Sequence, residues 1–207
     1  MVKIQMANIP RLLVGISAMI ISLSLLFQHQ ASPVIHIAAT YLVLVCFVDT
    51  FYSKIPNLCN LSLLAGAIIW NLWLSGGYGI VTVSLGLLVG FSLLVIPYLM
   101  GGMGGGDVKA LAALGALLGP VTILHVFVYI ALFGGLFSIL HYLFSRNFTA
   151  KVAGAGRALM AFAGTRDVAV LRPEVTEKLR FPYASAIAFG FFSYVQWGSI
   201  FSLLKSI

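Results

Sequence analysis

Charged residues are scarce in this sequence. Asp, Glu, Lys and Arg make up 8% of the 207 residues, while apolar residues make up 61%. A soluble domain carries about 25% charged residues, so this chain cannot cover its surface with solvated groups. The composition therefore excludes an ordinary soluble protein and predicts an integral membrane protein in contact with lipid. The length suits six to seven spans of roughly 20 residues each.

Metal-binding patterns are also missing from the sequence. The two cysteines, Cys46 and Cys59, form no CxxC pair, and the four histidines form no HExxH or other paired motif. Zinc sites need such spacing. The sequence therefore predicts no metal site and no cofactor, and we interpret the cysteines as small apolar residues.

The net charge of +7 does not indicate nucleic-acid binding, because the basic residues are distributed as in a membrane protein. Seven of the twelve lie in one stretch, from Arg146 to Arg180, and the others lie near the ends of apolar segments. This is the pattern of the positive-inside rule. No nucleic-acid partner is expected.

Seven apolar segments, separated by Pro, Gly and polar residues, predict an all-α polytopic bundle of about seven transmembrane helices. They cover about 12–27, 34–52, 58–75, 80–99, 107–119, 121–144 and 182–204. We expect one membrane-embedded domain over residues 1–207, with 145–181 as a basic cytoplasmic loop within it. The first segment has no small-x-small cleavage site after it and is expected to be an uncleaved helix.

Charge distribution predicts the orientation. With a cytoplasmic N-terminus and seven crossings, eleven of the twelve basic residues lie inside and only Lys205 lies outside. A single crossing over 107–144 would translocate the basic loop, so the short segment 107–119 is expected to cross a locally thinned membrane. Within the loop, 150–164 fits either a helix on the anionic cytoplasmic leaflet or a plain linker.

Two of the five acidic residues lie at or inside the ends of apolar segments. Asp49 ends the second segment and Asp107 opens the fifth, so the predicted topology places both at the cytoplasmic end of their helices. An ionised carboxylate in hydrocarbon costs on the order of 3 kcal/mol and marks a functional site by default. Two such groups that share a proton can perform aspartic proteolysis: one activates a water, and the other polarises the scissile carbonyl.

The glycines before Asp107 fit a substrate-binding loop. Gly104, Gly105 and Gly106 would let a substrate backbone approach closely and would permit positive φ, and exposed main-chain groups could pair with an extended peptide. A flexible interhelical loop is the alternative. A phosphate loop fits poorly, because no Gly-Lys-Ser/Thr follows.

Three further residues are predicted to shape the site, each with a structural alternative. Pro56 is expected to end the second helix and Asn57 to cap the third. Lys109 either tunes the charge of the carboxylate pair or is an interfacial cation that snorkels.

Three stretches, two of which contain these residues, resemble motifs of a known family. DTFYSKIPN (residues 49–57) resembles the D-x5-IPN signature of prepilin peptidases, GGGDVK (104–109) looks like their GxGDxK motif, and RFPYASAIA (180–188) is similar to a stretch in their last helix. The resemblance implies a multi-pass aspartic endopeptidase of the bacterial inner membrane. It implies Asp49 and Asp107 as the catalytic aspartates. Prepilins or pseudopilins would be the substrates, cut on the cytoplasmic side after a short basic leader.

The sequence departs from the larger members of that family. They carry an insert with paired CxxC motifs and also methylate the new amino terminus, whereas this chain has no CxxC. It resembles the short peptidase-only form found with Flp/Tad-type pili. Two alternatives stay open: a presenilin-like intramembrane protease, which shares GxGD, and a non-enzymatic proton-coupled carrier.

Overall fold

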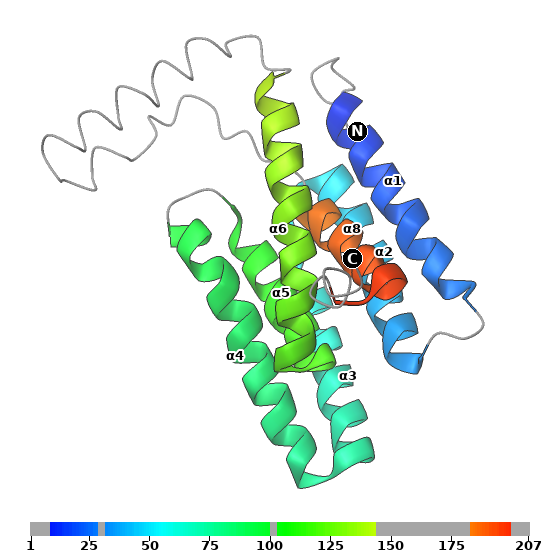
Figure 1. Cartoon of the computed structure of the whole chain (residues 1–207), viewed down its shortest axis with the longest axis vertical. Coiled ribbons are helices and arrows are strands. Elements are labelled where there is room, and N and C mark those ends of the chain that lie inside the picture. The colour runs from blue at the N-terminus through cyan, green and yellow to red at the C-terminus, as the bar shows by residue number, and fades with distance from the viewer. Residues whose placement is uncertain (1–8, 29–31, 100–102, 144–182, 200–207) are drawn as a thin grey trace, which may run out of the picture.

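The computed structural model describes residues 9–28, 32–99, 103–143 and 183–199, and within these ranges the chain forms seven helices and no strand (Figure 1). The helices are α1 (Ile9–Leu26), α2 (Pro33–Tyr52), α3 (Asn57–Ser75), α4 (Gly77–Leu99), α5 (Gly105–Leu118), α6 (Pro120–Leu143) and α8 (Tyr183–Trp197). The predicted all-helical fold with about seven helices is confirmed. The predicted segment 150–164 lies outside the described residues.

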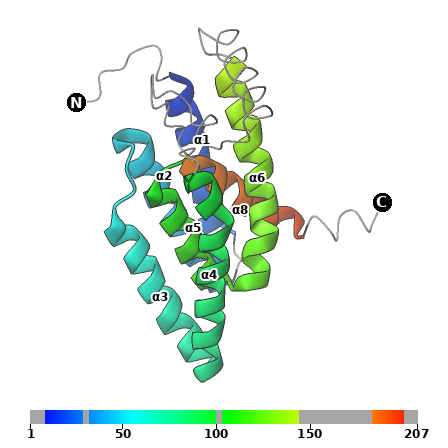
Figure 2. The ribbon, with the colours of Figure 1, turned by 90° about the vertical axis from the view of Figure 1, so that its left-hand side faces the viewer.

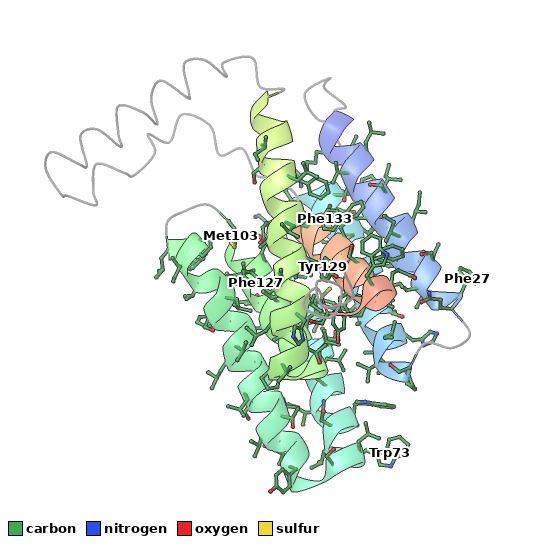
Figure 3. All side chains as sticks on the ribbon, in the orientation of Figure 1. Phe27, Trp73, Met103, Phe127, Tyr129 and Phe133 are labelled. Atoms are coloured by element: carbon green, nitrogen blue, oxygen red, sulfur yellow. The ribbon has the colours of Figure 1, made fainter. Side chains whose placement is uncertain are left out.

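Four helices are long and apolar enough to cross a membrane: α2, α3, α4 and the part of α6 from Pro120 to Ile139. Large apolar side chains cover the outside of the bundle (Figure 3). Trp73 is 77% exposed and Phe27 is 75% exposed. An outer surface of this kind is stable in lipid and not in water, so the protein is a multi-pass membrane protein.

The short helix α5 is enclosed by protein. Nine of its 14 residues are buried, and it packs beside α3 and α4 (Figure 2). At 1.5 Å per residue it is about 21 Å long, less than the roughly 30 Å of a bilayer core. Because its neighbours rather than lipid surround it, its length need not match the bilayer.

Close packing of α5 against α4 depends on glycine. A Cβ atom on Gly86 would overlap the main-chain carbonyl of Gly115, and a Cβ on Gly90 would meet the backbone of Leu111. Small residues at such a crossing let two helices approach backbone to backbone.

The connections follow local rules of helix termination, with two differences from the sequence expectation. The second helix ends at Tyr52, as the segment 34–52 predicts, but the residue that ends it is Ser53, in a left-handed conformation (φ 58°), and not Pro56. The last helix ends at Trp197 rather than near residue 204, since Gly198 has φ 71° and its N–H bonds Tyr194. Both residues close their helix with a left-handed cap.

Candidate active site

Asp49 lies in the last turn of α2 and is buried, with 8% of its surface exposed. Its main-chain carbonyl accepts hydrogen bonds from the Ser53 N–H at 3.0 Å and from the Arg11 guanidinium. Its side-chain Oδ1 is 3.9 Å from Arg11 Nη2. The other carboxylate oxygen, Oδ2, is buried and has no hydrogen-bond partner among the described residues.

Asp107 lies in the first turn of α5 and is half-buried. Its Oδ2 accepts the Gly104 N–H at 3.1 Å, and its own N–H donates to the Gly104 carbonyl at 3.1 Å. These reciprocal bonds satisfy a free N–H at the helix start. The carboxylate therefore has a fixed position at the positive end of the α5 dipole.

The glycines before Asp107 act differently from the expectation. Gly104 has φ −84°, and neither Gly105 nor Gly106 has positive φ, so none of the three adopts the left-handed conformation that glycine permits. Gly105 and Gly106 instead belong to the first helical turn. A Cβ on Gly106 would lie 3.1 Å from Cβ of Ile55. The absence of a side chain thus lets the turn that carries Asp107 pack against the α2–α3 connection.

Pro56 and Asn57 are also placed differently from the expectation. Pro56 is the N-cap residue of α3, with no side-chain capping bond, and Asn57 is the first helical residue rather than the cap. The amide of Asn57 is used elsewhere, because its Oδ1 accepts a hydrogen bond from Lys109 Nζ at 3.0 Å. Lys109 therefore links α5 to α3.

A second connection between helices was not expected from the sequence. The Tyr41 hydroxyl donates to Asn60 Oδ1 at 2.6 Å, and Asn60 Nδ2 donates to the Gly106 carbonyl at 3.4 Å. Tyr41 and Asn60 are both buried. The chain of bonds runs from α2 through α3 to the residue before Asp107. Asn60 could have been found as a polar residue within an apolar run, one turn after Asn57.

The start of α8 lies beside the end of α2. The Ala184 carbonyl accepts a hydrogen bond from Cys46 Sγ at 3.5 Å, one turn before Asp49. The same helix also packs against α5, whose first turn carries Asp107. A helix that is distant in the sequence therefore contacts both helices that carry the aspartates.

A groove of about 470 Å³ lies next to the first turn of α5. Its lining includes the polar residues Asn57, Asn60 and Lys109, and the rest is apolar surface from α3, α4 and α5. An apolar groove with a few polar groups is the common form of a binding site. Within the described residues, no group of three or more His, Cys, Asp or Glu side chains could hold a metal.

The fold and this arrangement define a class: a multi-pass helical membrane protein with one buried and one half-buried carboxylate at neighbouring helix ends. The profile of the type IV leader peptidase family matches residues 36–139, about half of the chain, and the protein belongs to this family. The match includes Asp49 and Asp107, while α1 and α8 lie outside it. Searches of curated proteins and of solved structures found no match.

Proposed function

We propose that this protein is an aspartic endopeptidase that removes the N-terminal leader of type IV prepilins or pseudopilins of the Flp/Tad type. Family membership supports a leader peptidase. The observation that carries the mechanism is the packing of the first turn of α5, which holds Asp107, against the α2–α3 connection that follows the buried Asp49, through Gly106 and Ile55. A peptide at this junction would meet both carboxyl groups.

The proposed reaction is a hydrolysis with no covalent intermediate. One carboxylate takes a proton from a water, whose oxygen attacks the scissile carbonyl carbon, and the protonated carboxyl group donates a hydrogen bond to the carbonyl oxygen. Collapse of the tetrahedral intermediate breaks the C–N bond, and the leaving amine takes the proton that the first carboxylate accepted from the water, which restores the starting pair. The paired acids supply both steps, so no cofactor is invoked.

The proposed setting is the inner (cytoplasmic) membrane, with the N-terminus and the two aspartates at the cytoplasmic face. The basic residues concentrated in 145–181 support this orientation, because such residues are retained inside. Gly104, Gly105 and Gly106 would seat the peptide backbone near Asp107. Asn57, Pro56 and Lys109 would shape the site, since Lys109 holds Asn57 across the α3–α5 contact.

The test is leader cleavage in detergent by the purified full chain, with a Flp-type prepilin as substrate. Asp49→Asn and Asp107→Asn should each reduce cleavage at least about a thousandfold and keep the protein folded. Asp167→Asn, in the segment outside the described residues, is the matched control and should cleave normally. Full activity in either active-site variant contradicts the proposal. A cut inside a transmembrane helix would favour a presenilin-like protease, and proton-driven solute uptake without cleavage would favour a carrier.

A further inference from the structure

Arg11, in the first turns of α1, reaches the Asp49 side chain although it lies outside the residues that match the family profile. Arg11 Nη2 is 3.9 Å from Asp49 Oδ1 and donates to the main-chain carbonyl of the same residue. The side chains of Arg11 and Asp49 are 22% and 11% exposed. This is the one ion pair found among the described residues. Partial burial of both partners reduces solvent screening of the pair.

The position of Arg11 is set by a second contact one turn along α1. Gly15 packs against the Thr50 side chain so closely that a Cβ on Gly15 would overlap it. Residues four apart lie on the same helix face. Arg11 and Gly15 therefore contact Asp49 and Thr50, which are consecutive in α2. Two contacts in register fix how far α1 can slide along α2.

The two oxygens of the Asp49 carboxylate have different surroundings. Oδ1 faces Arg11, whereas Oδ2 is buried without a hydrogen-bond partner among the described residues. Cys46, one turn earlier on α2, is buried and donates to the Ala184 carbonyl of α8. Asp107 is held by the Gly104 N–H at the start of α5. Arg11 is thus the cation that faces Asp49.

We propose that Arg11 is a positioning residue for Asp49: it fixes the carboxylate in one orientation, with Oδ1 toward the guanidinium and Oδ2 directed to the reacting water. This inference rests on the proposed peptidase function. The guanidinium suits the task because it stays charged and can contact the carboxylate and the main-chain carbonyl together. If Arg11 only helped to set the membrane orientation, as the positive-inside rule describes, it would not need a carboxylate partner.

The experiment compares Arg11→Gln and Arg11→Lys in the full chain, with prepilin cleavage and melting temperature measured in detergent. We expect Arg11→Gln to lower kcat by about tenfold to a hundredfold, with KM changed less than about twofold. Arg11→Lys should recover part of kcat, since it restores the cation but not the paired contacts of the guanidinium. Lys54→Gln, which removes an exposed cation near the same end of α2, is the control and should keep normal kinetics.

Two outcomes would overturn the inference. One is a normal kcat in Arg11→Gln. The other is an equal loss of kcat in both Arg11 variants with lowered melting temperatures, which would make Arg11 only an anchor of α1. The proposed function is tested separately: if Asp49→Asn is inactive while Arg11→Gln is normal, the peptidase stands and the role of Arg11 falls. If Asp49→Asn is fully active, the peptidase mechanism itself falls.

Discussion

The Nζ of Lys109 donates a hydrogen bond to Oδ1 of Asn57 at 3.0 Å, across the contact between α5 and α3. The two residues are 52 positions apart in the sequence and belong to the two motifs that resemble prepilin peptidases. Both side chains are exposed at the helix ends. The bond holds the first turn of α5, which carries Asp107, against the start of α3.

We predict that Asn57 and Lys109 contribute to catalysis together, through the hydrogen bond that joins them. Asn57→Leu and Lys109→Met should each lower kcat/KM about fivefold, which corresponds to about 1 kcal/mol. The double variant should be no worse than either single variant, because the second substitution removes nothing further. Lys54→Met is the matched control, as an exposed lysine on the α2–α3 connection, and should keep wild-type activity. Additive losses in the double variant would show that the two residues act independently.

The buried bond from Tyr41 to Asn60 predicts a loss of stability. Tyr41→Phe leaves Asn60 Oδ1 buried without its donor. The expected cost is about 0.6–2 kcal/mol, seen as a lower melting temperature. Because Asn60 also bonds the Gly106 carbonyl, kcat for leader cleavage should fall as well.

Tyr78→Phe removes the same hydroxyl from a side chain that is 84% exposed, at the opposite end of the α3–α4 pair. Its melting temperature and activity should match those of the wild type. Equal melting temperatures for Tyr41→Phe and Tyr78→Phe would mean that the Tyr41 bond contributes nothing to stability.

Much of the fold was predictable, because the length of the apolar segments and the Gly or Pro residues between them indicate where helices begin and end. All seven predicted segments correspond to helices, and most boundaries differ by three residues or fewer. The exception is the end of the last helix, because Gly198 closes α8 at Trp197. Smaller differences also have local causes. Gly105 and Gly106 form a helical turn ahead of the predicted start, since Asp107 caps it and packing against Ile55 holds it. Ser53 ends α2 in a conformation that its sequence neighbourhood does not indicate.

The site was less predictable than the fold. Asp49 and Asp107 could be selected from the sequence because carboxylates are rare in apolar segments, and their catalytic role stays a prediction. Arg11 was counted only as a cytoplasmic charge, since no local pattern shows which residue of α2 it meets. Tyr41 and Ala184 depend on contacts across 19 and 138 positions. Such contacts arise from helix packing, which periodicity does not specify.

The glycines at the α4–α5 crossing predict that adding one methyl group lowers stability at that crossing but not elsewhere. Gly86→Ala should lower the melting temperature markedly, because the new Cβ would overlap the Gly115 carbonyl and force the helices apart. Gly66→Ala is the matched control: nothing lies within 4 Å of its Cβ position in α3. It should be neutral or stabilising by about 0.5–1 kcal/mol. Equal effects at both positions would contradict the close crossing.

The ends of α3 allow a test of the direction in which the site faces. Lys54 lies on the α2–α3 connection, beside the site, and Ser75 is the last residue of α3; both are exposed. The 19 residues of α3 rise about 28 Å, close to the thickness of a bilayer core. Single cysteines at these two positions should therefore lie on opposite sides of the membrane.

The measurement uses Lys54→Cys and Ser75→Cys in a background with Cys46→Ala and Cys59→Ala, which removes both native thiols. A membrane-impermeant maleimide should label Ser75→Cys in intact spheroplasts and Lys54→Cys only after permeabilisation. This result would place Asp49 and Asp107 at the cytoplasmic face, because the α2–α3 connection packs against the turn that carries Asp107. The reverse pattern would place the site outside. Leader cleavage at the cytoplasmic face would then have to be abandoned, whatever the activity of the purified protein.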